Sequence, residues 1–194
     1  MADVVGICNS ALAKIGAARI VALTEGSKNA NVCAEQYDKL RDDLLRGHTW
    51  NFAIRRAKLA RLAEAPAFGF ARAYQLPADW LRTVAVQDDP DEASGARQPL
   101  RYRIEGRRLL SDAGAVYLRY VARVTDPNAM PPDFREALAA LLGRELAVPL
   151  AQSVNLQQVL DEQFRRRLRR ARSVDAVEDF PDDRPPGRWV AVRG

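Results

Sequence analysis

Helical and strand-like patterns occupy different parts of this 194-residue chain, and this arrangement constrains its fold most strongly. Apolar residues recur at helical spacing towards both ends, whereas alternation typical of strands is confined to the middle. The sequence therefore predicts a mainly α, α+β protein, a helical bundle with an inserted small antiparallel β region and an extended C-terminal tail. The predicted helices cover residues about 3–15, 29–46, 133–148 and 155–172, and the β insert covers about 81–124.

Cys8 and Cys33 lie on the apolar stripes of the first two predicted helices. A buried cysteine is usually a small hydrophobe, so this placement favours a core role over a reactive thiol. Gly16 and Gly47 follow the two stripes and are typical helix ends. Near the other end of the chain, Pro149 is expected to kink or end the third helix, and Asn155 can cap the fourth.

The middle of the chain contains three stretches with strand character. Residues 81–86 form one, a pair of stretches around Glu105-Gly106 is compatible with a hairpin, and Val116–Val124 forms the last. Residues 88–99 are acidic and lack any period, so we expect a mobile loop there. The segment 48–62 stays undecided between strand and helix, and residues 66–80 predict loop and edge structure.

The motifs and residues of several enzyme classes are missing from the sequence. One histidine, His48, and two cysteines are too few for a recognisable zinc site or a disulfide framework. A catalytic triad would depend on His48 alone, and no GxSxG, GxGxxG or Walker motif occurs. We therefore expect no enzyme activity, no metal and no cofactor. No apolar run reaches about 20 residues, and the start does not read as a secretory signal, so neither a membrane protein nor a secreted one is expected.

The basic charge of the chain is a local feature. The formal net charge is +5, and residues 163–173 alone contain six arginines and no acid. Arg165, Arg166, Arg169 and Arg170 are candidates for contact with DNA phosphates or with an acidic partner, because arginine binds phosphate and carboxylate alike. The alternative is a solvated helix face, supported by the i, i+4 pairs Asp161–Arg165 and Glu162–Arg166.

Two further predictions concern aromatic residues, one in the core and one in the C-terminal tail. Trp50, Phe52 and Trp80 are expected in the core, with an interface as the alternative. The tail, residues 174–194, contains apolar side chains among acids and prolines, and a segment of this composition cannot form a core alone. The apolar residues therefore favour a segment that becomes ordered when it binds a partner. These candidate binding residues are Phe180, Pro181, Trp189, Val190 and Val192.

Several uncommon sequence elements recur in one order. They are ALAKIGAARI and EGSKNANVCAEQYD near the start, then YDKLRDDLLRGHTWNFAIRRAKLARL, then YQLPADWLRTVAV. In these elements the chain resembles the tail tubular protein A family of phage head-to-tail adaptor (connector) proteins, over roughly residues 6 to 86.

The resemblance implies a structural, non-enzymatic protein. Residues 1–173 would be an adaptor domain that assembles into a closed ring of about twelve subunits. The ring would bind the portal protein on one side and a tail tube or nozzle protein on the other, with genomic DNA passing through its lumen during ejection. It would lie at the head-tail junction of the virion, after assembly in the bacterial host cytoplasm, and the tail would bind the portal or a neighbouring subunit. The rival hypothesis is a small DNA-binding regulator that uses the Arg-rich helix 155–172, although no helix-turn-helix spacing flanks that helix.

Overall fold

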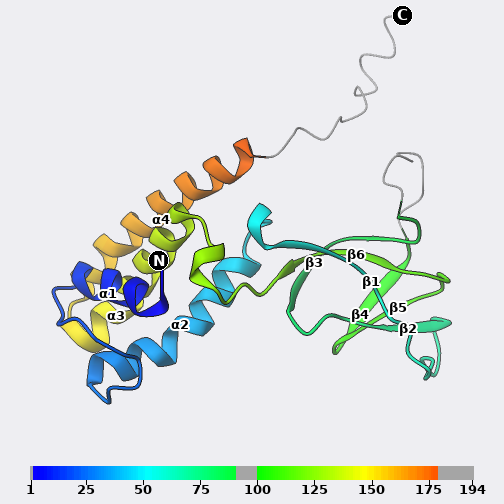
Figure 1. Ribbon diagram of the computed structural model, residues 1–194, viewed down its shortest axis with the longest axis horizontal. Coiled ribbons are helices and arrows are strands. Elements are labelled where there is room, and N and C mark those ends of the chain that lie inside the picture. The colour runs from blue at the N-terminus through cyan, green and yellow to red at the C-terminus, as the bar shows by residue number, and fades with distance from the viewer. Residues whose placement is uncertain (1, 91–99, 179–194) are drawn as a thin grey trace, which may run out of the picture.

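The computed structural model describes residues 2–90 and 100–178, which form a helical lobe and a β lobe side by side (Figure 1). The helical lobe contains α1 (Val4–Lys14), α2 (Lys28–Arg46), α3 (Pro132–Ala151) and α4 (Val154–Val177). The β lobe contains β1 (Ile54–Lys58), β2 (Arg72–Gln75), β3 (Trp80–Gln87), β4 (Tyr102–Glu105), β5 (Arg108–Ser111) and β6 (Tyr117–Ala122). The predicted mixed α+β fold is confirmed.

Three helices, α1, α2 and α4, begin where a side chain accepts a hydrogen bond from one of the first free N–H groups. Asp3 accepts from the Gly6 nitrogen at 2.6 Å and so caps α1, and Ser27 accepts from the Ala30 nitrogen at 3.2 Å at the start of α2. Ser153 caps α4 through the Leu156 nitrogen at 3.1 Å. The expectation that Asn155 caps this helix is therefore wrong, because the chain turns into α4 two residues earlier.

The helix α3 is the centre of the helical lobe and is buried along most of its length. Its Gly143 lies against α1, where an added Cβ would come within 3.3 Å of the Ala11 carbonyl oxygen, so a glycine permits this close approach. The helix runs past Pro149 and ends at Gln152, which has a left-handed backbone with φ 52°. The predicted end at residue 148 is thus three residues early, since the proline falls in the last turn.

The helices α3 and α4 form an antiparallel hairpin joined by Gln152 and Ser153. Arg144 bonds Asp161 at 2.9 Å near the connection, and Arg170 bonds Asp133 at 3.1 Å at the far end. The helix α4 then continues to Val177, beyond the predicted end at 172. The predicted boundary between residues 173 and 174 is corrected accordingly, because residues 174–177 belong to the folded helix.

The β lobe consists of two antiparallel sheets of three strands, ordered β1-β6-β3 and β2-β5-β4. In the first sheet Ile54 lies opposite Val121, and in the second Tyr74 lies opposite Leu109. The hairpin around Gly106 is confirmed, with Glu105 opposite Arg108 and Gly106 at φ 58°. The predicted insert of 81–124 is corrected to begin at Ile54, and its single sheet to two sheets.

The two sheets are connected through the chain that follows β1. The Leu62 nitrogen donates to the Ala73 carbonyl at 2.9 Å, and the Gln75 nitrogen donates to the Ala60 carbonyl at 3.0 Å. Residues 54–62 therefore pair with β6 at one end and with β2 at the other. This crossing closes the two sheets around a shared interior.

Each lobe has its own core. The core of the helical lobe includes Trp50, which donates from Nε1 to the Leu44 carbonyl at 2.9 Å, and Phe134, whose ring centroid lies 5.1 Å from that of Trp50. Between the sheets, the second core contains Val116, Leu118, Tyr120 and Ala122, which confirms the face predicted for this strand. Trp50 is 2% exposed, and Phe52 and Trp80 pack against the two cores, as predicted. Most of the predicted mobile loop, residues 91–99, lies outside the described residues.

Candidate functional site

The six arginines of α4 differ in whether they form an ion pair or a hydrogen bond with other described residues. Arg165 pairs with Asp161 at 2.9 Å, as predicted from the i, i+4 spacing, and Arg170 pairs with Asp133 of α3. Arg172 donates to the Gly47 carbonyl at 3.5 Å. The remaining three, Arg166, Arg167 and Arg169, are exposed, and none of them forms an ion pair within residues 2–90 and 100–178. The predicted Glu162–Arg166 pair is not formed there.

The opposite face of α4 holds the helix in place. Leu160 and Ala171 are buried and Phe164 and Leu168 half-buried against the core, as the apolar stripe predicted. Arg144 of α3 lies 5.4 Å from the centre of the Phe164 ring. We call Arg166, Arg167 and Arg169, which have no ion pair among the described residues, the arginine face. Because packing fixes the other side of the helix, the arginine face points away from the core.

This packing bears on how α4 can meet DNA. A helix-turn-helix joins its helices at about 90–120° and lets the second helix enter the major groove. Here α3 and α4 run antiparallel and are bonded at both ends, through Arg144–Asp161 and Asp133–Arg170. The arrangement favours contact along the side of α4 with a charged surface over insertion as a recognition helix.

Asp175, near the end of α4, is a residue that sequence reasoning placed in the tail. It is 7% exposed, and its Oδ1 accepts a hydrogen bond from the Asn51 backbone nitrogen at 2.9 Å. Its Oδ2 lies 3.4 Å from His48 Nε2. Burial and the positive charge of Arg172 lower the pKa of His48, although Asp175 acts in the opposite direction. Through its contacts with Asn51 and His48, Asp175 connects α4 to the start of the β lobe.

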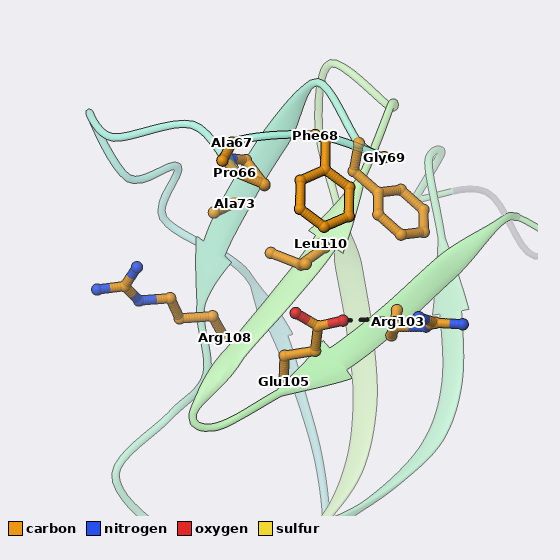
Figure 2. A pocket seen from close by; sticks show the side chains of 10 residues that line it. Pro66, Ala67, Phe68, Gly69, Ala73, Arg103, Glu105, Arg108 and Leu110 are labelled. Atoms are coloured by element: carbon orange, nitrogen blue, oxygen red, sulfur yellow. Dashed lines mark ion pairs between the residues drawn. The ribbon is translucent and has the colours of Figure 1, made fainter.

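A groove on the second sheet is the other feature that sequence reasoning missed. Its volume is about 590 Å³, and its lining comes from a loop before β2 and from the strands β2, β4 and β5: Pro66, Ala67, Phe68, Gly69, Phe70, Ala73, Arg103, Glu105, Arg108 and Leu110. Figure 2 shows the Phe68 ring above Leu110, with Arg103 and Arg108 on opposite sides of Glu105. The Phe68 side chain is 88% exposed, and Arg101 stacks 4.7 Å from the centre of the Phe70 ring. The signal for this groove was two phenylalanines in a loop rich in glycine, alanine and proline.

The ion pairs at this groove are long and exposed. Arg103 lies 3.8 Å from Glu105, and Arg108 lies 3.8 Å from Glu64. Their side chains are 70% and 54% exposed. Pairs of this kind contribute about 0–1 kcal/mol, so both guanidinium groups can exchange these partners for others at little cost.

The cysteines are buried, as predicted, and Cys8 and Cys33 are fully enclosed between α1 and α2. The hydrogen bond to Cys33, together with burial, raises the pKa of the Cys8 thiol. A thiol with a raised pKa is a poor nucleophile.

Within residues 2–90 and 100–178, no three His, Cys, Asp or Glu side chains gather closely enough to hold a metal ion. None of the described helices has the length and apolar character needed to cross a bilayer.

The remaining candidate residues, Phe180, Pro181, Trp189, Val190 and Val192, lie outside the described residues. Compared with known proteins, the chain matches no family model, and no curated protein is significantly similar to it in sequence.

Proposed function

We propose that this chain is a structural head-to-tail adaptor of a phage virion. In this proposal the subunit is a helical bundle with an inserted β lobe and a C-terminal tail, and it assembles into a ring of about twelve copies between the portal and the tail tube or nozzle. Genomic DNA passes through the ring without sequence-specific contact. The resemblance in the first 86 residues suggests the proposal, and the structure supplies one observation in its support.

That observation is the arginine face of α4. Arg166, Arg167 and Arg169 are exposed and have no ion pair in the described part of the chain, although they lie on a helix that is firmly packed on its other side. Such a rigid cationic surface suits a polyanion that slides past, because phosphate contacts hold DNA without reading its sequence. It equally suits an acidic protein surface across a ring interface.

The tail has a separate role in the proposal. Its apolar residues Phe180, Pro181, Trp189, Val190 and Val192 bind the portal or a neighbouring subunit. A segment of this composition gains little by folding alone and orders when a partner covers it.

The proposal is tested by mixing the purified protein with the matching portal. At micromolar concentration the free subunit is expected to stay monomeric, since weak heterologous contacts must overcome association entropy. On the portal we expect a ring, seen as co-sedimentation and as an added layer in negative-stain images. A doubly substituted R166E/R169E chain is expected to bind less well than an R19E/K28E chain, which carries the same change of charge on exposed residues elsewhere. If the wild-type protein does not sediment with the portal, the proposal is wrong.

A further inference from the structure

The groove on the second sheet exposes apolar surface that nothing in the described chain covers. Phe68 is 88% exposed at its edge, and Leu110, which is 7% exposed, lies at its floor. This apolar surface lies beside two arginines, Arg103 and Arg108, so the groove combines an apolar centre with cationic flanks. We infer that this groove receives residues 178–183, with the sequence EDFPDD, from a second copy of the chain.

The chemistry of the two surfaces matches in order along the segment. Phe180 and Pro181 stand between two pairs of acids, and the segment contains no cation. The groove has an apolar centre, and Figure 2 places Arg103 on one side of it and Arg108 on the other. The apolar pair would therefore lie against Phe68 and Leu110, while acids on either side meet an arginine.

The arginines are available for this exchange. Each guanidinium has five N–H donors, and the present partners Glu105 and Glu64 both lie 3.8 Å away on exposed side chains. Glu105 also lines the groove, so the lining contains two arginines and one glutamate. The four carboxylates of residues 178–183 supply more negative charge than Glu105 and Glu64 together. A segment that contains proline also loses less freedom when it binds an aromatic groove.

We take the segment from another copy because α4 belongs to the helical lobe and the groove belongs to the β lobe. Glu178 follows the last residue of α4, and residues 179–183 span at most about 18 Å when fully extended. Figure 1 shows α4 in the helical lobe and β2, β4 and β5 in the neighbouring β lobe. One segment and one groove on opposite lobes give each chain two different contact surfaces. A contact of this kind is heterologous and closes into a ring when the rotation between copies closes.

This inference rests on the proposed function only in taking self-assembly as the working state, and its test needs no portal. Two full-length variants are compared: R103E/R108E, which reverses the charge of the groove, and E178R/D179R/D182R/D183R, which replaces all four acids of the segment and so reverses its charge. Each variant alone places like charges at the contact and is expected to be monomeric. Mixed in equal amounts, the two variants regain opposite charges at every contact and are expected to associate. Sedimentation equilibrium up to about 1 mM measures this, because the wild-type contact is expected to have a Kd of about 0.1–1 mM.

The control is R19E/K28E, which makes the same change of charge as R103E/R108E on the helical lobe and is expected to associate like the wild type. Circular dichroism and melting temperature check that R103E/R108E is folded. If wild-type chains do not associate at 1 mM, or if the mixture stays monomeric, the inference is overturned. If the wild-type protein binds the portal but the mixed variants stay monomeric, the proposed function stands and this contact is wrong. If the mixed variants associate but the wild-type protein does not bind the portal, this contact stands and the proposed function is wrong.

A covalent trap gives a second measurement that does not depend on charge. Full-length R108C and D182C chains are mixed and oxidised with oxidised glutathione. Because Cys8 and Cys33 are fully buried, the introduced thiols are the accessible ones. A disulfide-linked dimer containing one chain of each variant is expected, at a yield several-fold above that from R19C mixed with D182C. Equal yields from the two mixtures would overturn the inference.

Discussion

Asp175, in the last turn of α4, accepts a 2.9 Å hydrogen bond from the backbone nitrogen of Asn51, 124 residues earlier in the chain. Asn51 in turn donates from its side-chain nitrogen to the Asp175 carbonyl oxygen at 2.7 Å. The end of the last helix is thereby tied to the residues that lead into the β lobe. This pair makes residues 174–177 part of the folded body.

Replacing Asp175 with alanine is expected to lower the free energy of unfolding by about 1.5–3 kcal/mol. The substitution leaves the Asn51 N–H without its carboxylate acceptor in a site that is 7% exposed, and hydrogen bonds to charged groups are worth about this much. Urea unfolding followed by circular dichroism measures the change. The control is Glu162→Ala on the exposed side of the same helix, expected to change stability by no more than about 0.5 kcal/mol. Equal effects of the two substitutions would show that the contact does not stabilise the fold.

Two C-terminal deletions are expected to behave differently. Removing residues 179–194 leaves both described cores and the Asp175 contact intact, so the melting temperature is expected to stay close to that of the full chain. Removing residues 175–194 also deletes Asp175 and is expected to lower the melting temperature by several degrees, since about 1 kcal/mol corresponds to about 2–4 °C in a chain of this size. Differential scanning calorimetry of the three proteins makes the comparison. A large loss of stability on the shorter deletion would place part of residues 179–194 in the core.

Stability is expected to fall as the pH drops from 7.5 to 5.5. Burial lowers the pKa of His48 in the folded protein, so the unfolded chain binds this proton more readily. The contribution of His48 is then fully present above the unfolded pKa of about 6.5 and is lost as the pH falls through the folded value. The chain has one histidine, so few other side chains titrate in this window.

The matching variant is His48→Gln, which keeps a polar side chain but cannot be protonated. Its urea unfolding free energy is expected to vary less between pH 7.5 and 5.5 than that of the wild type. If both proteins show the same slope, the pH dependence has another origin.

DNA binding by the free subunit is expected to be weak and indifferent to sequence. The arginine face has only three arginines and supplies few phosphate contacts, so the Kd is expected to be micromolar or weaker at physiological salt and to weaken further as salt rises. Replacing Arg166 and Arg169 with glutamine is expected to reduce this binding and to leave the unfolding free energy within about 0.5 kcal/mol of the wild type. Fluorescence anisotropy with duplexes of different sequence measures the Kd. Nanomolar binding that prefers one sequence would favour the rival hypothesis of a DNA-binding regulator.

The four helices could be predicted from the sequence because a local pattern of apolar residues indicates which face of each helix is buried. Apolar residues spaced three and four apart mark the face that packs, and this pattern placed Cys8, Cys33 and Leu160 correctly. The strands β1 and β2 could not be predicted in the same way. They are short, they carry Arg55, Arg56 and Arg72, and their pairing depends on β6 and β5, which lie far along the chain.

In the candidate site, too, features that depend on local sequence could be predicted, and features that depend on distant residues could not. The arginine face follows from helix geometry, so its exposure could be predicted, although which arginines find partners could not. Asp133 takes Arg170 only because α3 folds back antiparallel to α4. The burial of Asp175 likewise depends on a residue 124 positions away. In the groove, Phe68 and Leu110 meet only after two separate strands have paired.

The helical lobe is discontinuous in sequence, and this sets the order in which a nascent chain can acquire structure. The helices α1 and α2 leave the ribosome before α3, which begins at Pro132, yet they pack mainly against α3. The whole β lobe lies between them and is complete at Ala122. Units of a chain tend to fold as they emerge during synthesis. The β lobe is therefore able to fold before the helical lobe. Until α3 is synthesised, α1 and α2 lack the helix against which their apolar faces pack.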